Sequence, residues 1–319
     1  MPLLEVRGLV KRFAVRQGLL RLTIGWVRAV DAVTLSVERA QTLGIVGESG
    51  CGKSTLGRLA MGLLNPETGE VLVDGQPLAA WLHKDKPALR QRLQMVFQDP
   101  LDSLDPRLPV RESIAEPLQH KRLSRRDINA RVRQALQEVQ LPPEVAIAYP
   151  HELSGGQRQR VGIARAMIVE PAFVLCDEAV SSLDVSVRMQ VLHLLARLQK
   201  EKGVAYWFIS HDLAVVRAVS HEVAVMYLGA VVERGPAEAV LSQPWHPYTE
   251  ALVAAVPRPD PEKLVRVQPL AGEVPSPQAV PSGCRFRTRC PLAQERCARE
   301  EPALLEKSPG RWVACHFRP

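Results

Sequence analysis

The chain has 319 residues, a mass of 35.3 kDa and 46% hydrophobic residues, enough to bury one sizeable core, or one core and a smaller appendage. Its longest uncharged stretch near the predicted sheet, Val223 to Val232, is about ten residues, short of the roughly 20 that a membrane-spanning helix needs. The N-terminus lacks a basic region followed by a long apolar one, so no signal peptide is predicted and a cytoplasmic protein is expected.

The formal net charge of +7 has three possible origins: contact with nucleic acid, contact with an anionic membrane, or a basic solvated surface. Basic residues are spread along the chain, and the densest cluster, Lys121 to Arg126, lies in a polar stretch. Aromatic and basic residues do not alternate as they do in base-stacking surfaces. Nucleic-acid binding is therefore not predicted.

A glycine-rich segment, Gly47 to Ser54, fits the phosphate loop Gly-x-x-x-x-Gly-Lys-Ser. A predicted strand, Thr42 to Val46, precedes it, and apolar residues at helical spacing follow it: Leu56, Leu59, Ala60, Leu63 and Leu64. Backbone N–H groups of such a loop attract phosphate, its lysine reaches the β and γ oxygens, and its serine binds Mg²⁺. A chance glycine-rich turn before a helix is the alternative. The candidate nucleotide-binding residues are Gly47, Glu48, Ser49, Gly50, Cys51, Gly52, Lys53, Ser54 and Thr55.

A second apolar run, Phe173 to Asp177, predicts a buried parallel strand that delivers an acid to the carboxyl edge of a sheet. There Asp177 is expected to hold Mg²⁺ and Glu178 to polarise the attacking water. A third run, Ala205 to Ser210, places His211 at a sheet edge as well. Taken alone, the Asp-Glu pair is equally compatible with an ordinary helix start, and the histidine with a structural hydrogen bond.

The segment Leu153-Ser-Gly-Gly-Gln157 opens a predicted helix with Val161, Ala164 and Ile168 on one face. Ser154 is a natural N-cap, so an ordinary capped helix is the alternative reading. This segment, the phosphate loop and the Asp-Glu pair occur in one chain and in the expected order. Together they resemble the ATP-binding subunit of an ABC transporter.

The resemblance implies a role for each motif. Ser154, Gly155, Gly156 and Gln157 would close on the ATP of a partner subunit. The catalytic residues would be Glu178, His211 and Gln98, with His211 on the γ-phosphate and Gln98 in a mobile glutamine loop. Ser54, Gln98 and Asp177 would surround Mg²⁺. The adenine would stack on Phe13, with Trp26 as the rival and a structural role for Phe13 as a further alternative.

The resemblance also implies the fold, which is α/β. It is a P-loop NTPase of the ABC type, with a RecA-like core, an antiparallel β subdomain, an inserted helical subdomain and a small cysteine-containing C-terminal extension. The expected boundaries are 1–89 for the β subdomain and phosphate-loop core, 90–170 for the helical subdomain, 171–235 for the rest of the ATPase core and 236–319 for the extension.

The C-terminal part of the sequence indicates a particular branch of the ABC transporter family. His246 to Leu252 resembles the tail of dipeptide and oligopeptide transporter ATPases, a branch that includes nickel importers. Prolines that recur from Pro257 to Pro281 argue against long helices in the stretch that they span. The implied cargo is a peptide, with a nickel chelate or another solute open. A soluble ABC ATPase would need two cassettes or a long coiled coil, and a P-loop kinase has no use for the Ser154 segment.

The branch implies several partners. They are a second ATP-binding subunit, in a heterodimer rather than a homodimer, two transmembrane permease subunits and an extracytoplasmic substrate-binding protein. The chain would then lie peripherally on the cytoplasmic face of the membrane.

Four of the six cysteines crowd the end of the chain: Cys284, Cys290, Cys297 and Cys315. Disulfides are disfavoured in the cytosol, and the Cys-x-x-Cys spacing typical of zinc sites is absent. The resemblance implies a [4Fe–4S] cluster on these four thiolates, with zinc or unliganded thiols as alternatives. Nearby arginines either offset thiolate charge or are solvated: Arg285, Arg287, Arg289 and Arg296.

Overall fold

The computed structural model describes residues 1–18, 22–99, 103–256 and 275–318. Of the predicted proline-interrupted stretch from Pro257 to Pro281, residues 257–274 lie outside the described residues, and residues 275–281 contain no helix. Within the described residues as a whole, no helix combines the length and the apolar character that crossing a membrane requires. The chain forms two compact units, and each unit is assembled from separate stretches of sequence.

The first unit contains residues 1–5, 36–42 and 71–209 and is built around parallel strands. Strand β7 (Phe173–Asp177) lies between β6 (Leu93–Val96) and β8 (Ala205–Ile209). Every residue of β7 and β8 is buried, which explains why both strands are apolar throughout, Asp177 excepted, rather than alternating.

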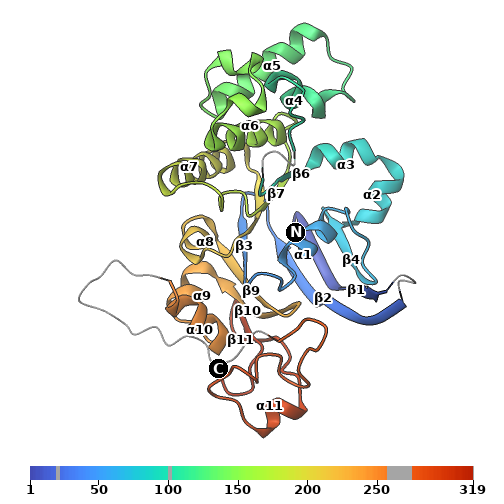
Figure 1. The fold of residues 1–319 in the computed structure, drawn as a ribbon, viewed down its shortest axis with the longest axis vertical. Coiled ribbons are helices and arrows are strands. Elements are labelled where there is room, and N and C mark those ends of the chain that lie inside the picture. The colour runs from blue at the N-terminus through green and yellow to red at the C-terminus, as the bar shows by residue number, and fades with distance from the viewer. Residues whose placement is uncertain (19–21, 100–102, 257–274, 319) are drawn as a thin grey trace, which may run out of the picture. The chain divides into compact units, whose positions relative to one another are not determined.

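Three helices of the first unit pack on one another: α4 (Val110–Ala115), α5 (Arg125–Glu138) and α6 (Gly155–Met167). Figure 1 shows them gathered together. Their buried residues recur at helical spacing because one face of each helix points into this small core. The other elements of the unit are β5 (Gln76–Pro77), α2 (Leu78–Lys84), α3 (Lys86–Arg92), α7 (Val185–Lys202), and the 3-10 turns η2 (Glu116–Leu118), η3 (Pro143–Ile147) and η4 (Pro150–Glu152).

The second unit contains residues 6–35, 43–70 and 210–319 and carries the phosphate loop. Its N-terminal elements are β1 (Leu4–Gln17), β2 (Leu22–Val37), β3 (Thr42–Val46), α1 (Lys53–Ala60) and β4 (Thr68–Val73). Its C-terminal elements are α8 (Leu213–Val219), β9 (Glu222–Tyr227), β10 (Ala230–Pro236), α9 (Ala237–Ser242), α10 (Pro247–Ala254), α11 (Glu295–Arg299), β11 (Leu305–Ser308) and β12 (Arg311–Val313).

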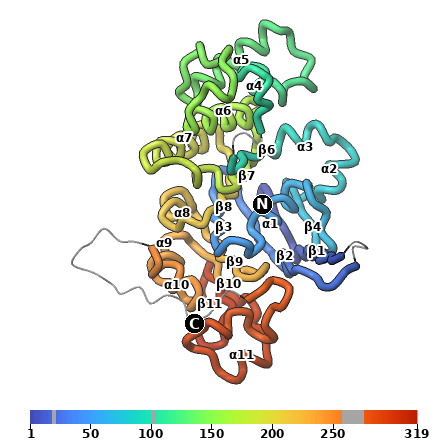
Figure 2. Tube along the Cα trace, in the orientation of Figure 1, coloured from blue at the N-terminus to red at the C-terminus, as the bar shows by residue number. Residues whose placement is uncertain are grey.

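The end of the chain adds strands to the sheet of the second unit. Strand β3 pairs in parallel with β9, and β9 pairs antiparallel with β10. Strand β12 then pairs antiparallel with β10, and β11 with β12. Figure 2 shows this last segment, from orange to red, at the bottom of the view, close to β10 and α10. The C-terminal segment is therefore part of the fold of this unit rather than a detached tail.

The sequence predicted the strands around the nucleotide motifs well, but it overestimated the helix after the phosphate loop. Strands β3 and β7 have the predicted bounds, and β8 ends one residue earlier than predicted, at Ile209. Helix α1 ends at Ala60, so the prediction that Leu63 and Leu64 are helical is wrong. The cause is Gly62, whose φ of 67° is a left-handed conformation that ends helices.

Candidate nucleotide-binding site

The loop between β3 and α1 is shaped by two glycines that no other residue could replace. A Cβ atom at Gly47 would lie 2.2 Å from the carbonyl oxygen of Met226, and one at Gly52 would lie 1.9 Å from that of Ala29. Gly52 is also the N-cap of α1 and supplies no side-chain hydrogen bond. The N–H groups at the start of α1 therefore have no side-chain cap, as an anion-binding loop requires.

Lys53 lies inside this loop. Its side chain is 4% exposed, and its Nζ donates to the carbonyl oxygens of Gly47 and Glu48 at 2.7 and 3.0 Å. Cys51 is buried beside it, and burial raises the pKa of the Cys51 thiol although Lys53 opposes the shift. Cys51 is thus a neutral packing residue here, and the lysine is the local cation.

The loop is also held by residues far along the chain. The backbone N–H of Glu48 donates to Tyr248 Oη at 2.9 Å. The carboxylate of Glu48 accepts two hydrogen bonds from Arg289, at 2.9 and 3.1 Å. The sequence predicts neither contact. It places Tyr248 in the tail motif of peptide-transporter ATPases and Arg289 near the C-terminal cysteines, but no local pattern links either residue to Glu48.

In the first unit, β7 ends at the buried Asp177, and Glu178 follows it with an unusual backbone. Glu178 has a φ of 49°, a left-handed conformation that costs a non-glycine residue free energy. Its N–H donates to the carbonyl oxygen of Ile209 at the end of β8, at 3.0 Å. Next to Asp177, the fully buried Cys176 has its pKa raised to about 12 by burial, so it is an inert thiol. Strain of this kind gathers at functional sites.

Helix α6 begins as predicted. Ser154 Oγ accepts from the N–H of Gln157 at 3.3 Å, and Gln157 Oε1 accepts from the N–H of Ser154 at 2.9 Å, which together form a capping box. Ser154 and Gly155 are exposed. The predicted face of the helix is buried, with Val161, Ala164 and Ile168 at 0%, 0% and 6% exposure.

Four further predicted residues, Gln98, His211, Phe13 and Trp26, are exposed on the surface, whereas Ser54 and Thr55 on α1 are partly buried. Gln98 follows β6 in the first unit, and His211 is the second residue in the last stretch of the second unit. Phe13 on β1 and Trp26 on β2 are 39% and 54% exposed, each with a basic side chain near its ring. Their exposure leaves both available as a platform for adenine.

The four C-terminal cysteines share one neighbourhood but not a metal-ligand geometry. Burial, together with weaker effects of the other three thiols, raises the pKa of Cys284 to about 11. The N–H of Cys284 donates to the carbonyl oxygen of Cys297 at 2.8 Å. Among the described residues, no group of three or more His, Cys, Asp or Glu side chains is placed to hold a metal ion. The structure therefore gives the predicted [4Fe–4S] cluster no support.

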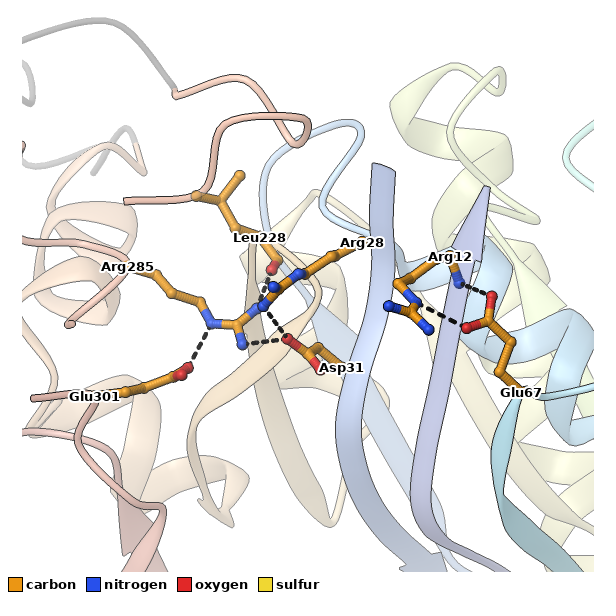
Figure 3. A network of polar contacts seen from close by, with 7 residues as sticks. All are labelled: Arg12, Arg28, Asp31, Glu67, Leu228, Arg285 and Glu301. Atoms are coloured by element: carbon orange, nitrogen blue, oxygen red, sulfur yellow. Dashed lines mark hydrogen bonds and ion pairs between the residues drawn. The ribbon is translucent and has the colours of Figure 1, made fainter. Parts of the chain in front are cut away.

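The expectation for the neighbouring arginines also changes. Arg285 and Arg289 are only 7% and 8% exposed, and both pair with carboxylates rather than facing solvent. Arg285 donates to Asp31, to Glu301 and to the carbonyl oxygen of Leu228, as Figure 3 shows. These two arginines therefore hold the C-terminal segment against the N-terminal part of the second unit.

Strand β3, the glycine loop and the uncapped start of α1 define a P-loop nucleotide-binding protein. Comparison with known families specifies the class. Residues 30–181 match the ABC transporter family, and residues 232–297 match the oligopeptide/dipeptide transporter C-terminal region.

Individual relatives agree. The chain is 51% identical over 317 residues (99% of this chain, 90% of the relative) to the probable peptide ABC transporter ATP-binding protein y4tS of Sinorhizobium fredii. It is 48% identical over 322 residues (98% and 95%) to the oligopeptide transport ATP-binding protein OppF of Salmonella typhimurium. The chain therefore belongs to the ABC transporter ATP-binding proteins, in their oligopeptide/dipeptide branch.

Solved structures show the same fold. The chain is similar to cbiO1 of Clostridium perfringens, part of an ABC transporter complex, with a TM-score of 0.65, 28% identity and coverage of 76% of this chain and 91% of that one. It is also similar to a dimeric ATP-binding cassette in a post-hydrolysis state with ADP and Pi, with a TM-score of 0.64, 26% identity and coverage of 73% and 98%. The predicted P-loop NTPase fold of the ABC type is thus confirmed.

Proposed function

We propose that this chain is the ATP-hydrolysing subunit of an importer of dipeptides or oligopeptides. The observation that carries the proposal is a sterically constrained phosphate loop in the same chain as a peptide-transporter C-terminal region. The names of the relatives that align over nearly the whole chain support a peptide as the cargo. A nickel chelate or another solute is the alternative cargo of such a transporter.

In the proposed site, ATP lies on the loop from Gly47 to Thr55, with the N–H groups at the start of α1 and the ammonium of Lys53 against its phosphates. The buried, carbonyl-held Lys53 fits this role because phosphate oxygens can replace the two carbonyl oxygens that it contacts. Ser54, Gln98 and Asp177 would hold Mg²⁺, which would supply positive charge against the phosphates.

Glu178 is the proposed general base that orients and polarises the attacking water, and His211 contacts the γ-phosphate. The place of Glu178, directly after Asp177 at the carboxyl end of β7, supports its assignment, since ligands bind at that edge of a parallel sheet. Phe13 is the proposed adenine platform, in preference to Trp26.

The proposed partner contact is made by the start of α6. The exposed Gly155 beside Ser154 leaves room for a partner's phosphate to approach, and the dimeric cassette among the similar structures supports closure of two subunits on each other. We favour a heterodimer with a second ATP-binding subunit, bound to two membrane permeases on the cytoplasmic face of the membrane, with an extracytoplasmic binding protein supplying the peptide.

The [4Fe–4S] cluster stays a prediction that rests on the resemblance alone. Four thiolates are the ligand set that such a cluster takes. Iron and acid-labile sulfide should be measured in protein purified without oxygen from iron-supplied cells. About four irons and four sulfides per chain are expected. Protein without iron would dismiss the cluster.

The function is tested by peptide uptake in membrane vesicles that contain this chain, the second ATP-binding subunit and the permease subunits, with the substrate-binding protein added outside. ATP inside the vesicle lumen, on the side of this chain, should drive accumulation of a labelled peptide. The Lys53→Ala variant should abolish it, because the loop then lacks its cation. Uptake of nickel chelates but not of peptides would select the alternative cargo, and uptake of neither would contradict the proposal.

A further inference from the structure

The phosphate loop contains a carboxylate, which is an unfavourable group beside a bound triphosphate. Glu48 is the second residue of that loop, and its side chain is 26% exposed. Its charge is met by the guanidinium of Arg289, whose side chain is only 6% exposed. The pair is bidentate, with Nη1 to Oε2 at 2.9 Å and Nη2 to Oε1 at 3.1 Å. Such paired hydrogen bonds fix the orientation of a carboxylate as well as its charge.

The turn that carries Arg289 is packed into a cluster of aromatic residues through Phe286. The backbone N–H of Arg289 donates to the carbonyl oxygen of Phe286 at 3.0 Å, and Phe286 is 1% exposed. The Phe286 ring meets Tyr227 of β9 at 5.3 Å and Tyr248 of α10 at 5.5 Å between centroids. Tyr248 in turn accepts the backbone N–H of Glu48. The backbone and the carboxylate of Glu48 are thus both held by C-terminal residues.

We propose that Arg289 is a positioning residue for ATP binding. By pairing with Glu48 it cancels a negative charge inside the phosphate loop and keeps that carboxylate turned away from the incoming phosphates. The C-terminal segment thereby sets the affinity of the loop for nucleotide. This inference rests on the proposed ATP site at Lys53.

The charge argument makes a prediction that a purely structural role does not. In Arg289→Gln the carboxylate of Glu48 loses its counter-charge and repels the phosphates. In the double variant Glu48→Gln/Arg289→Gln both charges are gone, and two amides of similar shape face each other. The single variant should therefore bind ATP more weakly than the double variant, although the double variant carries more changes.

The test is equilibrium binding of Mg-ATP to the full chain at low and high salt. Arg289→Gln should weaken binding about tenfold at low salt and less at high salt, where charge is screened. The double variant should return to within about threefold of the wild-type protein. Arg289→Lys keeps the charge but loses the bidentate geometry that orients the carboxylate, so it should weaken binding about threefold. If Arg289→Gln does not fold, Arg289→Lys is the readout, and wild-type affinity in it would overturn the inference.

The matched control is Arg287→Gln, in the same segment. Arg287 donates to Ser282 of its own segment, at 2.8 Å to the carbonyl oxygen and 3.4 Å to the hydroxyl, and its replacement should leave ATP binding unchanged. Wild-type affinity in Arg289→Gln would overturn the inference. Equal weakening in the single and double variants would also overturn it, since that result indicates a structural role alone. If the wild-type chain and Arg287→Gln bind no Mg-ATP, the proposed ATP site itself fails and the inference falls with it.

Discussion

The phosphate loop and the start of α6 are both glycine-rich segments at helix N-termini, yet they are held in different ways. The phosphate loop depends on Tyr248 and Arg289, which lie 200 and 241 positions from Glu48. The start of α6 depends on a capping box formed by Ser154 and Gln157, three positions apart. The first segment is supported by distant parts of its unit, and the second is complete by itself and exposed.

The difference corresponds to the proposed roles. A loop that binds this chain's own nucleotide gains affinity from being held in its bound shape, because little ordering remains to be done on binding. A helix start that contacts the ATP of a partner must stay open until the partner arrives. If this is correct, substitutions at the start of α6 should impair hydrolysis without impairing ATP binding to the phosphate loop.

Hydrolysis should separate from binding most strongly at Glu178. Glu178→Gln removes the proposed base but leaves Lys53 and the loop donors, so ATP should bind while turnover by the assembled transporter falls about a hundredfold or more. Single-turnover hydrolysis and nucleotide binding, measured on the same preparation, check this. Turnover near that of the wild-type protein would move the catalytic role to another residue.

Ser154→Arg should block the proposed contact with the partner without affecting the chain's own loop. We expect hydrolysis by the assembled transporter to fall about tenfold or more, because the loss of a group that stabilises charge in the transition state lowers the rate by at least this factor. ATP binding to the isolated chain should change less than about threefold. Ser124→Arg is the matched control. Ser124 caps α5 by accepting a hydrogen bond from the N–H of Asp127 at 3.2 Å, so the control also loses an N-cap. It does so outside the segment from Leu153 to Gln157, which we call the signature segment. Equal losses in both variants would attribute the effect to capping.

The support of the phosphate loop should depend on pH through His246. Burial lowers the pKa of His246 from 6.5 to about 3, and its Nδ1 accepts from the N–H of Tyr248, so the folded protein keeps this histidine neutral. Below pH 6.5 the unfolded chain binds a proton that the folded chain does not. Stability from this group is therefore complete above pH 6.5 and decreases as the pH falls, by about 2 kcal/mol at pH 5.

His246→Asn keeps an N-cap acceptor but does not titrate. The difference in unfolding free energy between pH 7.5 and pH 5 should shrink by about 2 kcal/mol in this variant, measured by denaturant titration. Identical pH dependence in variant and wild-type protein would show that His246 is not the titrating group.

The smallest effect concerns the packing of α6. A Cβ atom at Gly156 would lie 2.4 Å from Val187 Cγ1, whereas one at Gly155 would lie 3.9 Å from Leu183 Cδ2. Because valine is restricted in its rotamers, Gly156→Ala should lower the free energy of unfolding by about 1 kcal/mol. Gly155→Ala should not lower it. Thermal unfolding of the two variants compares them directly, and equal stability would mean that Val187 moves aside without cost.

The sequence predicted the parts that depend on nearby residues. Apolar runs of strand length gave the bounds of β3 and β7, and the spacing of Ser154 and Gln157 predicted a capped helix. The end of α1 was missed because one glycine in a left-handed conformation outweighed the apolar periodicity. Arg289 and Tyr248 could not be assigned to Glu48, since their contacts arise only when the C-terminal segment folds onto β9 and β10.

The contacts of the buried residue Glu233 could not be predicted from the sequence either. Glu233 on β10 is 0% exposed and accepts the N–H groups of Trp245 and His246 and a hydrogen bond from Arg311. It joins three segments of the second unit. A single glutamate in an apolar strand gives no sign of this role in the sequence, because its partners are brought to it by tertiary structure.

The central claim is that this chain binds ATP by itself but needs a partner's signature segment to hydrolyse it. The most direct measurement compares the rate of ATP hydrolysis by the isolated full chain, saturated with Mg-ATP, with its rate per chain in the assembled transporter. We expect the isolated chain to bind ATP and to hydrolyse it at least about tenfold more slowly. Hydrolysis by the isolated monomer at the rate of the full assembly would contradict the account.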